Sequence, residues 1–170
     1  PEHGYYRRDP FGRAGDFFTA EQLQPVFGRL IAQYAAALCP PEVCTIVELG
    51  AGRREMAPFF QNFAYVPVDI GFGSLPDAFS GLVFANEFFD ALPVDVVIMR
   101  CGELRHVRVD FRKDGFVWIE AEPASADAAA FAGEIAEGTR LEVNLSALEW
   151  LDRVGGALQR GSVLIIDYGY

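Results

Sequence analysis

One feature constrains the fold of this chain more than any other: a short apolar strand that runs directly into a Gly-x-Gly turn. Residues 45–49 read as the strand, and Glu48 and Leu49 lead into Gly50-Ala51-Gly52. Glycine lets the backbone pass close to a ligand and adopt φ angles closed to other residues. We expect a helix over residues 54–63, whose N-terminus would offer free N–H donors. The carboxyl edge of an open α/β sheet binds ligands, so this turn is a candidate binding site.

Apolar runs and helical periodicity divide the rest of the chain into alternating elements. Strands are expected at 65–69, 81–86, 94–100, 107–111, 116–120, 140–145 and 162–167. One helix is expected at 20–38, with Thr19 as its N-cap, or with a start nearer 24 because of Pro25. A second helix is expected from Ser146 to Gly161, and residues 124–136 are predicted to form a helix or a linker. Alternating strands and helices predict a mostly parallel sheet with helices on both faces. Lys113-Asp114-Gly115 adds an antiparallel hairpin to this single α/β domain.

A second acidic residue, Asp69, ends the next strand, 19 residues after Gly50. A carboxylate in that place can accept hydrogen bonds from both hydroxyls of a ribose, a device that NAD-binding folds share. The dinucleotide fingerprint requires a third glycine where this chain has Glu55, and a nucleotide-dependent oxidoreductase is therefore the weaker interpretation. Glu48, two residues before Gly50, can instead hold the ammonium group of S-adenosylmethionine (SAM).

The segment Asn86-Glu87-Phe88-Phe89-Asp90 follows another apolar strand and so belongs to the same edge of the sheet. Two acids and an amide beside a sulfonium cofactor could hold a nucleophile. The competing interpretation is a helix N-cap at Asn86 with a solvated Asp90. The spacing alone leaves both open.

Composition narrows the classes of partner. The 170 residues are 51% hydrophobic, which suffices for one core, and the formal net charge of −10 repels a phosphate backbone, so nucleic acid is not expected. No apolar run approaches the roughly 18 residues of a membrane span. Three cysteines without metal-type spacing indicate reduced thiols inside a cell and no metal site.

Several segments, in order, resemble the MidA-like methyltransferases, whose mitochondrial members are complex I assembly factors that methylate arginine in a protein subunit. The matching segments are Gly4-Tyr5-Tyr6, Gly15 to Ala20, Phe27-Gly28, Glu48 to Arg53, Asn86 to Val94, Glu142-Val143, Trp150-Leu151 and Ile166 to Tyr170. The stretch 86–94 is the most specific of them.

The resemblance implies a Rossmann-like, class I SAM domain that transfers a methyl group to a protein arginine. It implies that residues 41–170 form the cofactor-binding core, with residues 1–40 covering the site, Gly15 and Thr19 included. The implied cofactor contacts are Glu48, Gly50, Ala51, Gly52, Asp69 and Asn86. Glu87 and Asp90 are the implied grip on the guanidinium. The implied location is the bacterial cytoplasm or the mitochondrial matrix.

Three departures from the family pattern suggest a shortened member or a fragment. Arg54 stands where the family has glycine, and only 16 residues separate Asp69 from Asn86, where the family fits a helix, a strand and a loop. The chain also stops at Tyr170, whereas family members continue. An alternative function is therefore a catalytically inactive module that acts through cofactor or protein binding. The sheet edge left by missing strands predicts a partner chain or a homo-oligomer.

Overall fold

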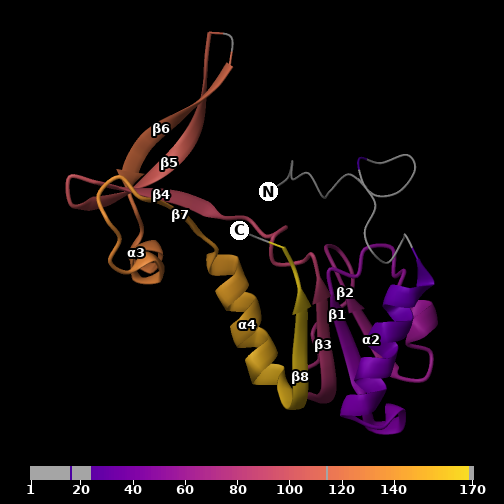
Figure 1. Ribbon diagram of the computed structural model, residues 1–170. Helices are drawn as coiled ribbons and strands as arrows, with labels where there is room; N and C mark the ends of the chain where they lie inside the picture. The colour runs from indigo at the N-terminus through magenta and orange to yellow at the C-terminus, as the bar shows by residue number, and fades with distance from the viewer. Residues whose placement is uncertain (1–15, 17–23, 114, 169–170) are drawn as a thin grey trace. The chain divides into compact units, whose positions relative to one another are not determined.

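The computed structural model describes residue 16 and residues 24–113 and 115–168, so the expectations for Tyr5, Gly15 and Thr19 lie outside it. The chain divides into two compact units. The first comprises the residues up to Ala91 together with those from Asp152 onward, and the second comprises Leu92–Leu151 (Figure 1). Each unit has a four-stranded sheet of its own.

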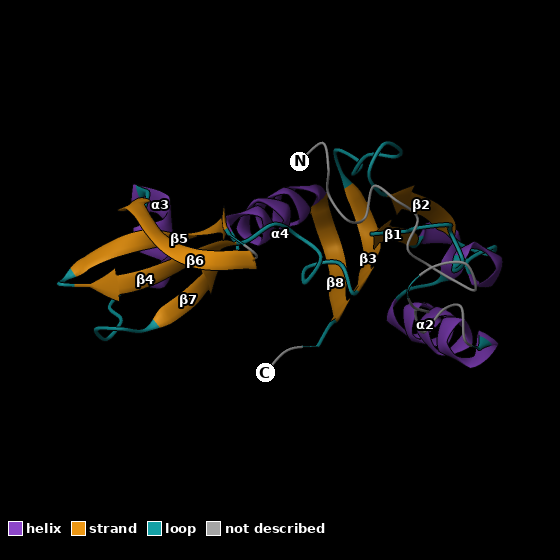
Figure 2. Ribbon diagram, turned by 90° about the horizontal axis from the view of Figure 1, so that it is seen from above, coloured by secondary structure: helices purple, strands orange, loops and turns teal. Residues whose placement is uncertain are grey.

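The first unit contains a parallel sheet, which confirms the expected α/β fold. Its strands are β1 (Thr45–Leu49), β2 (Ala64–Val68), β3 (Phe79–Asn86) and β8 (Leu158–Ile166), in the spatial order β2-β1-β3-β8 (Figure 2). Because all four strands run in the same direction, their carboxyl ends meet at one edge of the sheet.

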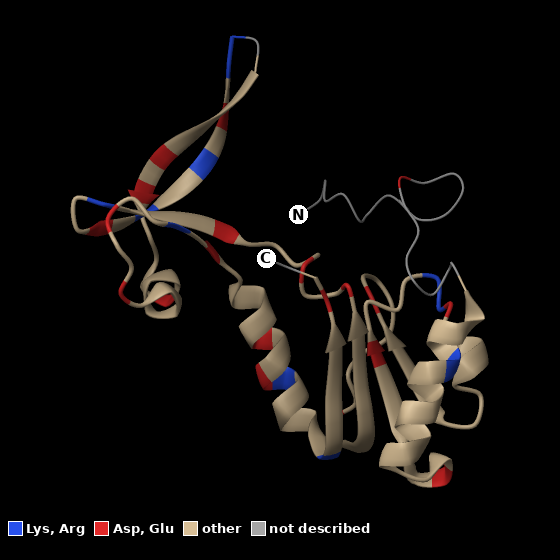
Figure 3. Ribbon diagram, viewed as in Figure 1, with Lys and Arg blue, Asp and Glu red and all other residues tan. Residues whose placement is uncertain are grey.

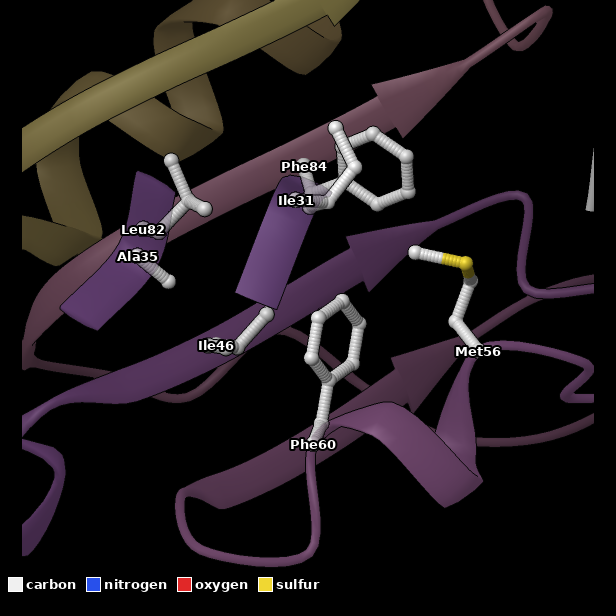
Figure 4. Packing of buried hydrophobic residues seen from close by; sticks show 7 residues of the cluster. All are labelled: Ile31, Ala35, Ile46, Met56, Phe60, Leu82 and Phe84. Atoms are coloured by element: carbon white, nitrogen blue, oxygen red, sulfur yellow. The ribbon is translucent and has the colours of Figure 1, made fainter. Parts of the chain in front are cut away.

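Helix α2 (Pro25–Leu38) packs its apolar stripe onto one face of this sheet. Proline at the first helical position has a suitable φ and no N–H to leave unpaired, so this helix starts at Pro25, the later of the two starts expected. The buried cluster in Figure 4 joins Ile31, Ala35, Ile46, Met56, Phe60, Leu82 and Phe84. A side chain at Gly28 would collide with the ring of Phe59, which explains the glycine in this helix.

The expected helix over residues 54–63 is wrong. Only a single 3-10 turn, η3 (Ala57–Phe59), forms between β1 and β2; another, η2 (Pro41–Val43), precedes β1. Gly52 and Arg54 have φ angles of +49° and +63°, which a right-handed helix cannot accommodate. Pro58 also lacks the N–H that would extend the turn. The turn after β1 is therefore not followed by an α-helix.

The connection from β2 to β3 contains neither a helix nor a strand, as its short length predicts. It begins with a tight loop in which Asp69 and Phe72 exchange backbone hydrogen bonds of 3.0 and 3.2 Å. In the part of the chain that the structure describes, no strand lies beyond β2, where Rossmann folds have one.

The second unit is a four-stranded antiparallel sheet partly covered by one helix. Its strands are β4 (Asp95–Arg100), β5 (Glu103–Arg112), β6 (Gly115–Pro123) and β7 (Arg140–Val143), in the order β6-β5-β4-β7. The expected hairpin is confirmed as β5–β6, and it belongs to a sheet separate from the parallel one. Helix α3 (Ala126–Ala132), capped by the Ser125 hydroxyl, packs Ala128 against Val97 and Val143.

Helix α4 (Leu145–Ala157) carries the chain from the second unit back into the first. Its cap is Asn144, whose side-chain oxygen accepts the Ala147 N–H at 2.9 Å, and not Ser146 as expected. The helix also ends earlier than the expected Gly161. Gly155 and Gly156 weaken its last turn, and β8 begins at Leu158.

Candidate functional site

Four neighbouring strand ends bring the candidate residues of the first unit to one edge of the parallel sheet. Glu48 is the penultimate residue of β1 and the glycine turn follows this strand. Asp69 follows β2, and the segment 86–90 begins at the last residue of β3. Asp167 follows β8 and joins them. Acidic positions mark this edge of the sheet in Figure 3.

The glycine turn is closed onto the neighbouring strand. The N–H groups of Gly50 and Ala51 both donate to the carbonyl of Val68, at 2.9 and 3.2 Å, and the Gly52 N–H donates to Asp69 Oδ2 at 2.5 Å. The free helix N–H donors expected from the sequence are therefore absent from this turn. Asp69 instead ties the turn to β2, and its Oδ1 accepts the Ile70 N–H at 2.5 Å.

Glu48 is 4% exposed, and its Oε2 accepts a hydrogen bond from the Tyr65 hydroxyl. Burial, and then the negative charge of Glu48, raise the pKa of Tyr65 far above its usual value. The tyrosine therefore stays protonated and continues to donate. Sequence reasoning missed Tyr65, although its place on β2, the strand that pairs with β1, could have identified it.

Gly50 links the turn to the third motif. Its φ is +72°, and a Cβ placed on it would lie 2.9 Å from Cδ2 of Phe88. Gly52 differs, because the nearest atom to a Cβ there would be Glu55 Oε2, at 3.8 Å. The backbone at Gly52 is therefore open to a ligand, whereas Gly50 is needed for the close approach of Phe88.

No helix follows Asn86, so the interpretation of this residue as a helix N-cap is wrong. Asn86 is the last residue of β3, and Glu87 adopts a φ of +49°, in the left-handed region that favours glycine. The Glu87 N–H donates to the carbonyl of Ile166 at 2.8 Å, which holds the strained residue in place. Strained backbone of this kind concentrates at functional sites.

Asp90 faces Asp167, a residue that the sequence placed in a family motif but not in the site. The Asp90 N–H donates to Asp167 Oδ2 at 3.2 Å. Asp90 is an exposed residue, as the competing interpretation expected, yet partial desolvation, and then the charge of Asp167, raise the pKa of its carboxyl above the ordinary value. A hydrogen bond with the Tyr168 side chain opposes this shift. Because Asp167 follows an apolar strand, the rule that identified Asp69 could have identified it too.

The Arg54 side chain contacts the β2–β3 connection. Its guanidinium lies over the ring of Phe72 in the β2–β3 connection, 4.6 Å from the ring centroid. The backbone explains why the family has glycine here, since a φ of +63° is costly for a residue with a side chain.

The residues at this edge fit the charge of SAM, which carries a sulfonium and an ammonium group. The edge is strongly acidic, because it carries the five carboxylates of Glu48, Asp69, Glu87, Asp90 and Asp167. The space beside Gly52 leaves the backbone there accessible to a ligand. Among the described residues, no three His, Cys, Asp or Glu side chains are grouped as metal ligands. The described helices also include none long and apolar enough to cross a membrane.

Comparison with known proteins identifies relatives of this chain. Residues 61–170 match the model of a family described as putative S-adenosyl-L-methionine-dependent methyltransferase. A curated relative is the mitochondrial protein arginine methyltransferase NDUFAF7 homolog of Drosophila melanogaster. The two sequences are 29% identical over an alignment of 168 residues, which covers 65% of this chain and 38% of the relative.

Two crystal structures of Burkholderia thailandensis proteins of one superfamily share the fold. The first, bound to S-adenosyl-homocysteine, has a TM-score of 0.80 and 28% identity, and the match covers 100% of this chain and 55% of that one. The second, a native structure, has a TM-score of 0.70 and 25% identity, and the match covers 89% of this chain and 50% of that one. The chain thus spans about half or less of the length of these relatives.

Proposed function

This chain belongs to the S-adenosyl-L-methionine-dependent methyltransferase family whose model it matches, and we propose that it forms the cofactor-binding part of a protein-arginine methyltransferase. The observation that carries the proposal is the gathering of a glycine turn and five carboxylates at four adjacent strand ends. Relatives bound to S-adenosyl-homocysteine or named as arginine methyltransferases support it.

The cofactor-binding role falls to the residues that follow β1 and β2, with Asn86 at the end of β3. Asp69 accepts hydrogen bonds from the ribose hydroxyls on the lone pairs that its backbone contacts leave over. The glycine turn from Gly50 to Gly52 faces the methionine part of SAM, with its open backbone at Gly52. Glu48, fixed by Tyr65, supplies negative charge toward the ammonium group. These carboxylates provide the electrostatic preference for a cationic ligand.

The acceptor role falls to Glu87 and Asp90. Methyl transfer from a sulfonium is an in-line displacement, so positioning of the nucleophile supplies much of the rate. An arginine guanidinium stays protonated and delocalised, which makes it a poor nucleophile. Two carboxylates can hold it bidentately, localise its charge and direct one nitrogen at the methyl carbon. As the N–CH3 bond forms, the S–CH3 bond breaks and the sulfur leaves as the thioether of S-adenosyl-homocysteine. The guanidinium nitrogen loses its proton late, to water, so no strong base is required.

Calorimetric titration with S-adenosyl-homocysteine, with NAD as the competing ligand, tests the cofactor site. We expect binding of the former alone. Asp69→Asn should weaken it about tenfold or more, as the loss of a hydrogen bond to a charged acceptor would. Asp77→Asn is the matched control on the same connection, because Asp77 is exposed and lies outside the site. Equal affinity of the two variants, or preferential NAD binding, would reject the assignment.

Transfer of a labelled methyl group from SAM to peptides tests the acceptor. Arginine peptides should be labelled and their lysine-substituted counterparts should not. Asp90→Asn should reduce the labelling while S-adenosyl-homocysteine binding persists. Loss of binding in that variant would place Asp90 in the cofactor site instead.

A further inference from the structure

The outer half of the β5–β6 hairpin has no sheet beside it. Strand β4 pairs with β5 only over Glu103–Val107, so residues 108–112 of β5 and 115–119 of β6 pair only with each other. The hairpin accordingly extends past the end of β4 (Figure 1). An isolated two-stranded ribbon is at best marginally stable in water, so this ribbon needs support from a further surface.

One face of this ribbon is apolar. Val109 lies opposite Trp118 and Phe111 lies opposite Phe116, and the period of two places all four side chains on the same side. Their exposed fractions are 54%, 58%, 62% and 80% in the order Val109, Trp118, Phe111, Phe116. We refer to these four residues as the hairpin face. The solvent side of an antiparallel sheet is normally polar, so the hairpin face is suited to contact with another protein.

The hairpin face continues onto the four-stranded part of the sheet. A hollow of about 280 Å³ lies beside Trp118, lined by Val96, Arg140, Leu141 and Glu142. Helix α3 lies elsewhere, over Val97 and Val143, whose side chains alternate with that of Val96 and point to the other face of the sheet. No element described within the second unit therefore covers the hairpin face.

Charge favours a second copy of this chain as the occupant. The whole chain carries a formal charge of −10, so two copies repel each other over most of their surfaces. Residues 100–122 contain five Arg or Lys and five Asp or Glu, so this segment is neutral. Its basic side chains pair nearby, as in Arg100–Glu120, Arg105–Glu103, Arg108–Glu122 and Arg112–Asp110.

The available area is enough for a small interface. Large aromatic side chains bury about 150–250 Å² each, so three rings at these exposures offer roughly 300–500 Å² per copy. Two copies that pack these rings together bury roughly 600–1,000 Å², which approaches the about 1,000 Å² that a specific interface should exceed. Val109 and the rim of the hollow beside Trp118 add to this area.

We propose that the hairpin face forms the contact of a homodimer, in which two copies pack their Phe111–Phe116 pairs against each other across a two-fold axis. An isologous contact of this kind uses the same patch on both copies. It supplies the missing support for the ribbon. It does not depend on the cofactor site.

Sedimentation equilibrium of the whole chain over a concentration series tests the proposal. We expect a monomer–dimer equilibrium. Phe116→Ser should raise the dissociation constant of the dimer about a hundredfold, since a central ring is lost from both copies. Val117→Ser is the matched control, because Val117 is the adjacent residue and points to the opposite face. Both variants should bind S-adenosyl-homocysteine like the original chain.

A second measurement applies if Phe116→Ser does not fold. In a chain whose exposed Cys101 is replaced by serine, Phe116→Cys should form a disulfide-linked dimer under oxidation, and Val117→Cys should not. A chain that stays monomeric at all concentrations would overturn the proposal. So would a dimer that tolerates Phe116→Ser, or equal cross-linking of the two cysteine variants.

Discussion

Replacing Gly50 with alanine should disturb both the stability of the first unit and its cofactor site. Gly50 has a φ of +72°, and the added Cβ would lie 2.9 Å from Cδ2 of Phe88. Two costs therefore arise from a single methyl group. One is backbone strain, and the other is displacement of the ring that joins the glycine turn to the segment 86–90.

The two costs can be estimated separately. The left-handed conformation costs a residue with a Cβ roughly 1–2 kcal/mol. Carbon atoms pack at about 3.5–4.0 Å, so Phe88 has to retreat by at least about 0.6 Å. Overpacking of this kind costs about 1–3 kcal/mol, and a half-buried ring favours the lower end. We expect a total of about 2–4 kcal/mol for Gly50→Ala.

Gly71→Ala is the matched control, because it has the first cost without the second. Gly71 lies in the same unit with a φ of +87°, and a Cβ added to it would meet no atom within 4 Å. It should lose only about 1–2 kcal/mol. Urea unfolding of both variants measures the difference, and calorimetry with S-adenosyl-homocysteine should show at least about a tenfold loss of affinity for Gly50→Ala.

A double-mutant cycle decides whether Phe88 is the cause. Phe88→Ala removes the ring atom that the new Cβ meets, so it should cost less in the Gly50→Ala background than in the original chain. The reasoning is refuted if Phe88→Ala costs the same in both backgrounds. It is equally refuted if Gly50→Ala and Gly71→Ala destabilise the unit by the same amount and leave cofactor affinity unchanged.

Two further substitutions test the carboxylates of the site. Tyr65→Phe removes the hydrogen-bond donor to buried Glu48 and should lower the free energy of unfolding in urea by about 1–3 kcal/mol. Tyr34→Phe, at an exposed position of α2, should change it by no more than about 0.5 kcal/mol. Equal changes in the two variants would contradict the role of Tyr65. Asp167→Asn removes a negative charge that is the second cause, behind desolvation, of the raised pKa of Asp90. Since Asp90 must be ionised to hold a guanidinium, the acid limb of kcat/KM should move to lower pH, and an unmoved limb would exclude this coupling.

The strands could be predicted because each is a short apolar run bounded by turn residues, and the carboxyl-edge rule then placed Glu48, Asp69 and the segment 86–90 together. The helix over 54–63 failed for a local reason. Its apolar residues have helical spacing, but the backbone before it takes positive φ angles at Gly52 and Arg54, which periodicity does not reveal.

Contacts between segments that are distant in the sequence also could not be predicted. The hydrophobic pattern gives the period of a strand but not its partner, so it could not show that β4 and β7 pair with the hairpin in a separate sheet. The hydrogen bond from Tyr65 to Glu48 and the approach of Asp167 to Asp90 also depend on strand order, which became visible only in three dimensions.

The discontinuity of the first unit has a consequence for synthesis on the ribosome. Strand β3 pairs with β8, and the partners Phe79 and Leu158 are 79 residues apart in the chain. At about 5–20 residues per second, one side of β3 waits roughly 4–16 s for its partner to be made. During that interval the nascent chain presents an apolar strand with an open hydrogen-bonding edge. The second unit is synthesised in the same interval, and pairing of Asp95 with Val143 brings its two ends together. Its early folding would therefore shorten the search by which β8, once made, finds β3.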